Sequence, residues 1–480
     1  MAFKFGNREQ QTFFPPAIED YVSSQDPVRV YDAFVDALDF HQLGISLIPK
    51  AGAEAYYPVR MLKLLIYSYS YGLRSARLIE RACYHNLSYI WLMGDLKPDY
   101  RTIARFRSEH KDVIKKVLKQ CVRMCVNMGL VDGNTLFIDG SKFRADASLD
   151  NTLSRQQIEK ELKKAEDSIE QLLNECERKD EEEAGLSSLV ETQEKITSQE
   201  RLAERMKQCL SKIDSEKLAS INTVDPDCII AKSRQGTHAV HNVQCVTDRK
   251  HGLIVQADTV GEPNDNNQLL PQIKQAAENI GRKPEAVCAD AGFFNPKKTE
   301  KIDPAITVIM PSPQQAHQDK AVVKTVPAQF DKVNFQYDKE RDEYLCPEGK
   351  RLTHKGVDSE RPHRNIYQAK SSDCIKCPYW EVCTTAKHGR KVTRSEYEDI
   401  IKNQEAIYKS EYGQEIYKLR KQRAEHPFGH IKRNLRAGQF LLRGREKVNA
   451  EISVLATCFN ITRMITIIGI TKLIANLRVI

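Results

Sequence analysis

Apolar residues recur with two different periods along this chain, and the order of the two periods predicts an α/β protein with helical additions. Residues 1 to about 130 carry apolar positions at helical spacing, which predicts an all-α N-terminal domain. The period then changes, because a short apolar run leads directly into Asp139 and a glycine. A second such run, in EAVCADAGFF, leads into Asp290. Each run predicts a buried strand that delivers a carboxylate to a site at its end.

The stretch from 151 to 220 has the stripe of a two-helix hairpin. Apolar residues recur there at spacings of four and three on both sides of an acidic run that ends at Gly185, where a turn is expected. The pattern predicts a coiled-coil helical insertion after the first strand. Dimerisation and a purely structural arm both fit such a hairpin. Its stripe consists of Ile158, Leu162, Ala165, Ile169, Leu172 and Cys176, then Leu189, Ile196, Leu202, Met206 and Ile213.

Strand and helix patterns return after residue 220. THAVHNVQCVTD and GLIVQADTVG predict strands, NDNNQLLPQIKQAAENIG predicts a helix ending at Gly281, and ITVIMPS predicts a strand after the one with Asp290. This order predicts an RNase H-like core, in which helices cover a mixed sheet. The expected domains are 1–130, helical and DNA-binding; 131–150, first core strand; 151–220, helical hairpin; 221–325, core continued; 326–400, an irregular Cys-rich insertion; and 401–480, a helix with Glu425 and the last core helices.

The positive charge of the chain is locally clustered. Lys and Arg number 73 against 65 Asp and Glu, a net charge of +8 over 480 residues. The segment RTIARFRSEHKDVIKKVLKQCVR is expected to form one helix with eight basic residues, which suits contact with a phosphate backbone. A solvated face of a bundle helix is the alternative. The residues predicted to contact DNA are Arg101, Arg105, Lys115 and Lys119.

No secretory signal is expected at the N-terminus, because MAFKFGNREQQ has charge but no apolar core. The most apolar stretch, near the C-terminus, is interrupted by Asn460, Arg463 and Lys472, which predicts an amphipathic core helix in preference to a membrane span. We therefore expect a cytoplasmic protein with no membrane partner. Its 13 cysteines are then expected to be reduced thiols or metal ligands.

Four cysteines fall in the basic segment YLCPEGK and in CIKCPYWEVC. A C-x2-C pair with two further cysteines, accompanied by turn-forming Pro347, Gly349 and Pro378, predicts a structural Zn²⁺ site. Four reduced cysteines in a small insertion are the alternative. The predicted ligands are Cys346, Cys374, Cys377 and Cys383.

Two strand aspartates and a late helical glutamate are the residue types that hold two divalent metal ions for phosphoryl transfer. Mg²⁺ (or Mn²⁺) prefers hard oxygen ligands, and Asp139, Asp290 and Glu425 supply them. Asp132 and Asp146 are rivals for the first position, but one precedes the apolar run and the other lies beyond the expected turn.

His426 and His430 have the spacing of a helical metal-binding pair. Pro427 and Gly429 interrupt them, so packing or phosphate contact is the preferred role.

Taken with FIDGSKFRADAS, AVCADAGFF and AEHPFGHIKR, the chain resembles bacterial insertion-sequence transposases of the DDE class. The resemblance places that family's metal-binding triad on Asp139, Asp290 and Glu425. It also implies phosphate contacts from a tyrosine, an arginine and a lysine near the glutamate, which fall on Tyr417, Arg420 and Lys432.

The spacing around the glutamate departs from that family's pattern. Four residues separate Arg420 from Glu425, where the better-known pattern has three. On an ideal helix Arg420 would lie about 140° away from Glu425, so Lys421 is the better-aligned cation. Pro427 is expected to kink or restart the helix near His426.

The function implied by this resemblance is Mg²⁺-dependent cleavage at transposon ends and strand transfer into target DNA. The implied partner is double-stranded DNA, both terminal inverted repeats and target, bound by a homodimer at the bacterial nucleoid. Two alternatives are an RNase H-like nuclease without strand transfer and an inactive DNA-binding regulator.

Overall fold

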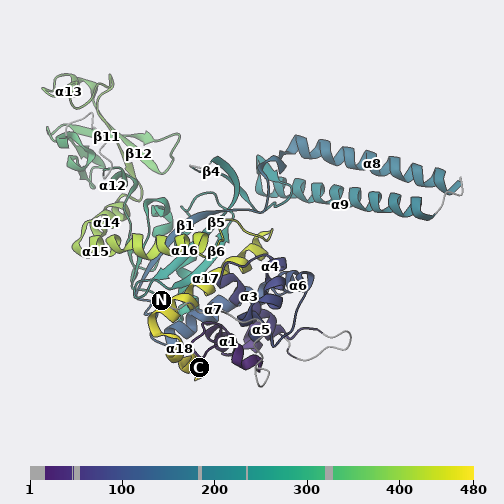
Figure 1. Ribbon diagram of the computed structural model, residues 1–480. Helices are drawn as coiled ribbons and strands as arrows, with labels where there is room; N and C mark the ends of the chain where they lie inside the picture. Colours follow the sequence, from purple (N-terminus) through teal and green to yellow (C-terminus); the bar gives the residue numbers. More distant parts are fainter. Residues whose placement is uncertain are drawn as a thin grey trace, which may run out of the picture. The chain divides into compact units, whose positions relative to one another are not determined.

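The computed structural model describes residues 17–45, 47, 55–181, 186–233, 236–318 and 328–479, and it has a mixed α/β fold (Figure 1). Two compact units divide the chain. The first unit comprises Met1–Asp265, Pro271–Pro284 and Arg420–Ile480. The second unit comprises Asn266–Leu270 and Glu285–Leu419.

Helices fill the described N-terminal part of the first unit, as the apolar spacing predicts. The segment expected to be one basic helix is two helices, separated at His110, whose φ of −98° and ψ of 25° leave the helical region. The expectation of a single helix was therefore wrong. The helices are α1 (Val28–Asp36), α2 (Phe40–Leu43), α3 (Pro58–Ser70), α4 (Ala76–His85), α5 (Leu87–Met93), α6 (Tyr100–Glu109) and α7 (Lys111–Asn127).

An antiparallel sheet forms the centre of the first unit. β5 (Gly236–Asp248) pairs with β1 (Thr135–Arg144), β4 (Ile229–Ser233) and β6 (Ile254–Val260). The sequence predicted that β1 ends at Asp139. The strand instead continues to Arg144. Its partner strand β5 is long enough to pair with all of that extension, from Gly140 opposite Gln244 to Arg144 opposite Val240.

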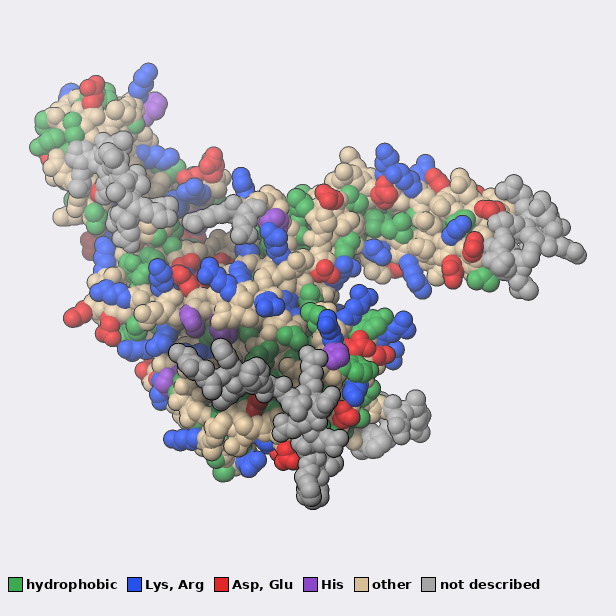
Figure 2. Space-filling view, viewed as in Figure 1, with side chains coloured by type: hydrophobic (Ala, Val, Ile, Leu, Met, Phe, Trp, Pro, Cys, Tyr) green, Lys and Arg blue, Asp and Glu red, His purple; other side chains and the backbone are tan. Residues whose placement is uncertain are grey.

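Two long helices form an arm that leaves the sheet after β1 (Figure 1). α8 (Arg155–Glu181) and α9 (Leu186–Glu216) lie side by side, and Ile158, Met206 and Ile213 are buried between them. Charges of both signs are interspersed along the arm's surface (Figure 2). The expected turn at Gly185 lies outside the described residues. At the base of the arm, β2 (Thr152–Ser154) pairs antiparallel with β3 (Ser220–Asn222).

The C-terminal part of the first unit is helical. A π-helical turn, Lys421–Glu425, is followed directly by α16 (His426–Arg433), so a new α-helical segment starts at His426, where Pro427 was expected to kink or restart the helix. α17 (Arg445–Ile468) is long and apolar enough for a membrane span, but 67% of its apolar window is buried inside the protein. Buried Asn460 on this helix pairs with the backbone of Ile254 on β6. The first unit also holds α18 (Ile470–Leu477) and, from Pro271 onward, α10 (Leu269–Ile280).

The second unit contains a parallel strand pair and a separate antiparallel sheet. β7 (Ala286–Cys288) pairs in parallel with β8 (Thr307–Ile309). The segment expected to be irregular forms a five-stranded sheet in the order β13-β12-β11-β10-β9, with its own small core around Tyr344, Leu352 and Tyr367. Its strands are β9 (Gln336–Asp338), β10 (Glu343–Leu345), β11 (Arg351–Val357), β12 (Arg364–Ala369) and β13 (Lys391–Ser395). The helices are α11 (Pro296–Thr299), α12 (Pro313–Gln318), α13 (Ser371–Ile375), α14 (Glu398–Lys409) and α15 (Glu411–Arg420).

Candidate active site

Asp139 lies in the middle of β1 and is 8% exposed. The residues before it, Leu136 to Ile138, are fully buried, so the apolar run anchors the strand beneath the carboxylate. Side chains alternate between the two faces of a strand, which places Asp139, Ser141 and Phe143 on one face.

α16 covers this face of β1. The Lys432 ammonium donates hydrogen bonds to Ser141 Oγ (2.7 Å) and to the carbonyl oxygen of Lys142 (2.8 Å), and it lies 4.4 Å from the centre of the Phe143 ring. The Phe428 ring also packs against Phe143. Burial lowers the pKa of Lys432, while the nearby Asp139 charge opposes that shift. A half-buried cation is thus held beside Ser141, two residues from Asp139.

Arg420 bridges two of the predicted triad carboxylates. Its Nη2 lies 2.9 Å from Asp139 Oδ1, and its Nη1 lies 3.8 Å from Glu425 Oε1. The side chains of Arg420 and Asp139 are 13% and 12% exposed, whereas that of Glu425 is 52% exposed. Because Arg420 and Asp139 are largely shielded from water, their attraction is only weakly screened. The positive guanidinium also reduces the repulsion between the carboxylates of Asp139 and Glu425.

The π-turn explains why Arg420 and Glu425 face the same way. Consecutive π-turns link residues five apart, whereas an α-helix aligns residues three or four apart. The expectation that Arg420 points about 140° away was therefore wrong, because it assumed an ideal α-helix. Lys421, which that geometry favoured, is exposed.

Asp290 follows β7 in the second unit. Its Oδ1 accepts a hydrogen bond from the backbone N–H of Gly292 (2.8 Å), so the carboxylate caps the short helical turn Ala291–Phe293. A Cβ atom at Gly292 would lie 2.9 Å from the same oxygen. Gly292, two residues after Asp290, therefore lets the backbone turn tightly beneath the carboxylate.

The rival aspartates have other partners. Asp146 pairs with Arg443 at 3.0 Å, and Asp132 accepts a hydrogen bond from the Asn134 backbone before β1 begins. Tyr417, on α15 in the second unit, packs edge-to-face against Tyr408.

His426 and His430 both contact the ring of Phe459. Burial lowers the pKa of both imidazoles, which favours their neutral forms. Their ring centres lie 6.4 Å apart, in keeping with the packing role.

The basic residues of α6 and α7 differ in their surroundings. Lys119 pairs with Glu278 at 2.5 Å, and Lys111 pairs with Glu446. Arg101, Arg105 and Lys115 are exposed. Part of the predicted basic face is thus engaged in ion pairs within the first unit, and part is open to solvent.

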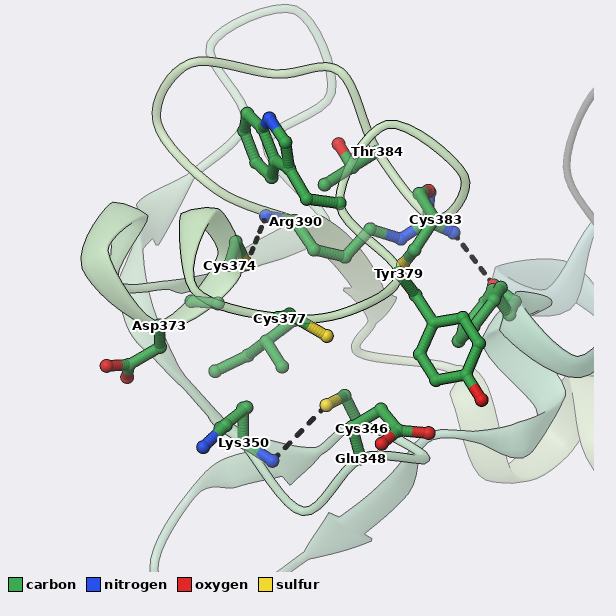
Figure 3. Close-up of a pocket in the computed structure, with 14 residues that line it drawn as sticks. Cys346, Glu348, Lys350, Asp373, Cys374, Cys377, Tyr379, Cys383, Thr384 and Arg390 are labelled. Atoms are coloured by element: carbon green, nitrogen blue, oxygen red, sulfur yellow. Dashed lines mark hydrogen bonds between the residues drawn. The ribbon is translucent and has the colours of Figure 1, made fainter.

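The four cysteines predicted to bind zinc line one cavity of about 30 Å³ in the second unit. The sulfur atoms of Cys346 and Cys377 point into the space between the two loops that carry them (Figure 3). Two thiols accept backbone hydrogen bonds, Cys346 from Lys350 N (3.2 Å) and Cys374 from Arg390 N (3.3 Å). Among the residues that the structure describes, no group of three or more His, Cys, Asp or Glu side chains forms a ready metal cluster.

A carboxylate on the opposite face of β1 was missed by the sequence reading. Asp265 Oδ1 accepts hydrogen bonds from Asn242 (2.9 Å) and Gln244 (2.6 Å) on β5. A Cβ atom at Gly140 would lie 2.8 Å from this oxygen, so a larger residue after Asp139 would push the Asp265 side chain aside. The signal was present as polar residues at alternate positions in HNVQCV, where an apolar face would be expected.

Two family models match the chain. A model described as a transposase DDE domain matches residues 345–465, which include Glu425 and Lys432. A model described as a transposase domain matches residues 16–109, across the N-terminal helices. No curated protein matches the chain. No solved structure matches it either.

Proposed function

Because this chain belongs to the insertion-sequence transposases of the DDE class, we propose that it cleaves phosphodiesters at transposon ends and joins the released ends to target DNA, with Asp139, Asp290 and Glu425 as the metal-binding carboxylates. The observation that carries this assignment is the Arg420 guanidinium between Asp139 and Glu425. A cation between two carboxylates marks a position where a metal ion would be stabilised in the same way.

An RNase H-like core is the proposed framework for these residues. The antiparallel strands β6, β5 and β1, then helix α10 and the parallel pair β7–β8, support this fold. In that fold Asp290 joins Asp139 and Glu425. We retain the sequence-based domain bounds as part of the proposal, with the α8–α9 arm as a coiled-coil insertion.

The donor set fits a hard divalent cation, since all three proposed ligands are carboxylates. Bound Mg²⁺ or Mn²⁺ would supply activation of the attacking oxygen and stabilisation of the leaving oxygen. In the first step, water attacks phosphorus in line and the strand leaves with a 3′-OH. In the second, that 3′-OH attacks a target phosphodiester and displaces the target's own 3′ oxygen. Neither step needs a covalent intermediate with the protein.

The cations near the carboxylates would hold the DNA phosphates. Arg420 presents a planar fork suited to a phosphate, and Lys432 adds a charge two residues along β1. Tyr417 and Lys421 are proposed as further contacts near the cut. Arg101, Arg105, Lys115 and Lys119 are proposed to contact the backbone farther away, and Lys119 would have to exchange Glu278 for a phosphate.

A structural zinc ion is proposed for the cavity lined by Cys346, Cys374, Cys377 and Cys383. Backbone N–H groups that point at thiol sulfurs stabilise the thiolate form that zinc requires. Gly349, with φ of +71°, makes the tight turn that returns the Lys350 amide to Cys346. The ion would join the two loops of the Cys-rich sheet.

Transposition requires both ends of an element, so a homodimer on DNA is proposed, acting at the nucleoid. The presence of all three proposed carboxylates argues against an inactive regulator. A nuclease without strand transfer would need the same carboxylates, so the strand-transfer assay below separates it from a transposase.

The test is a set of single substitutions assayed on DNA that carries both ends of the element. Asp139→Asn, Asp290→Asn and Glu425→Gln should each abolish Mg²⁺-dependent cleavage and strand transfer, because each removes a ligand charge, yet retain binding to the ends. Asp132→Asn and Asp146→Asn are the controls and should cut. Cleavage by all three triad variants would refute the assignment, and an active Asp139→Asn beside an inactive Asp146→Asn would move the first carboxylate.

A double variant, Arg101→Glu with Arg105→Glu, tests the proposed backbone contacts of α6. Whereas the triad variants should keep DNA binding, this variant should lose it. It should weaken binding to all DNA sequences and flatten the salt dependence, because phosphate contacts release counterions. An unchanged salt slope would mean that α6 faces away from DNA.

A further inference from the structure

The helix that carries Glu425 has a local defect in its backbone hydrogen bonding. In a regular α-helix the carbonyl of Arg423 would accept a bond from the N–H of residue 427, but residue 427 is a proline. Proline has no N–H, and its ring collides with the carbonyl four residues earlier. The π-turn Lys421–Glu425 lies at this point of the chain. Pro427 therefore favours a widened turn directly before itself.

A side chain of the sheet supplies a donor for that carbonyl. Thr247, on β5, is fully buried, and its hydroxyl donates a hydrogen bond to the Arg423 carbonyl oxygen at 3.0 Å. Thr247 lies opposite Phe137 in the pairing of β5 with β1, two residues before Asp139. The strand pair that positions Asp139 thus also holds the backbone of the π-turn.

We propose that Thr247 is a positioning residue for the catalytic carboxylates. Its hydroxyl fixes the Arg423 carbonyl, the fixed carbonyl maintains the π-turn, and the π-turn directs Arg420 and Glu425 toward Asp139 despite the extra residue between them. In a regular α-helix, residues five apart diverge by about 140° and Glu425 would leave the site. This inference rests on the proposed metal-binding role of Glu425.

The first test replaces Thr247 by valine, which keeps the shape and removes the hydroxyl. Cleavage of DNA bearing the transposon ends should fall on the order of 10- to 100-fold, the usual effect of misplacing a reacting group by about 1 Å. Binding to the ends should be unchanged, and Thr247→Ser should restore cleavage because it restores the donor. Wild-type cleavage by Thr247→Val would overturn the inference.

A matched control comes from the neighbouring strand. Thr259 on β6 is also buried, and its hydroxyl bonds to Asn449 at 2.7 Å. Thr259→Val makes the same chemical change and loses one hydrogen bond, but it lies away from the π-turn. It should therefore retain cleavage. An equal loss of cleavage in both variants would mean that Thr247 only stabilises the fold and does not position the carboxylates.

The second test makes the π-turn unnecessary. Deleting exposed Gln422 and changing Pro427 to Ala leaves three residues between Arg420 and the glutamate, a spacing that a regular α-helix aligns on one face. This variant should cut, and adding Thr247→Val to it should cause no further loss. An inactive deletion variant, or a further loss on adding Thr247→Val, would contradict the mechanism.

Glu425→Gln distinguishes a failure of the proposed function from a failure of the positioning role of Thr247. If Glu425→Gln is inactive while Thr247→Val is fully active, the proposed function stands and the positioning role fails. If Glu425→Gln is active, the proposed function itself fails.

Discussion

At the scale of single residues, Asp248 shows how the stability of the sheet depends on pH. Its carboxyl is buried at the end of β5 and accepts hydrogen bonds from the backbone N–H groups of Gly133 and Lys250, both at 2.8 Å. Burial raises its pKa to about 6, against the opposing effect of the Gly133 hydrogen bond, and the nearby Asp132 raises it further. This carboxyl is therefore easier to protonate in the folded state than in the unfolded chain.

The sign of the pH effect follows from the direction of that shift. A folded-state pKa above the unfolded value of about 3.9 means that the contribution to stability is full below pH 4 and is lost as pH rises through 6. The loss should be on the order of 3 kcal/mol between pH 4 and pH 8. Denaturant unfolding across this range measures it, and Asp248→Asn should flatten the dependence. An identical slope in that variant would assign the effect to another group.

The sequence predicted a single site residue best where the signal lay in its immediate neighbours. The apolar run before Asp139 needs only a few consecutive residues to be recognised. The direction of Arg420 could not be obtained this way, because it depends on the π-turn, where Pro427 removes one backbone donor and Thr247, 176 residues from Arg423, supplies another. Contacts between residues so far apart in sequence leave no periodic signal.

At the scale of elements, long periodic segments were predicted and short ones were not. The strands β5 and β6 and the helix α10 fall in the segments predicted for them. The five-stranded sheet of the second unit was missed because strands such as β9 and β10 have three residues each, too few to show alternation. The helix Arg101–Arg123 was predicted as one because its periodicity continues across His110, where the backbone nevertheless breaks.

We predict that the Cys-rich sheet of the second unit binds one zinc ion. Protein purified without chelator should contain about one zinc per chain, and Cys377→Ser should lower that content and destabilise this sheet, because a structural site needs its full set of thiolates. Cys288→Ser, a change at a buried thiol outside the cavity, is the control and should leave the zinc content unchanged. Metal analysis that finds no zinc in the unmodified chain would end the idea.

At the scale of the whole molecule, we predict that the α8–α9 arm can be removed without unfolding the rest of the chain. Ser154 and Ser220 are directly opposite on the antiparallel strands β2 and β3, where the chain enters and leaves it. An Asn-Gly turn can therefore replace residues 155–219, since two residues of this type close an antiparallel pair. The arm's apolar residues pack mainly against one another, so its removal should shift the melting temperature of the remainder by less than about 4 °C.

Removal of the arm also decides between its two proposed roles. If the arm forms the dimer interface, light scattering should give the mass of a monomer for the shortened chain bound to DNA-end fragments. The full chain on the same fragments should give the mass of a dimer. Equal masses would make it a structural arm only. A shortened chain that no longer folds would show that the arm supports the core, contrary to the packing around Ile158 and Met206.

The π-turn has a consequence for how such chains are found. One residue more or fewer between an arginine and a glutamate normally turns the two side chains apart, so a search pattern with fixed spacing treats the change as a loss of the motif. Here the π-turn accommodates one extra residue in the helix and so keeps the two side chains on the same side. What selection would have to preserve is the direction of two side chains, and a relative with either spacing can meet that requirement if a proline and a buried hydroxyl change together with the insertion.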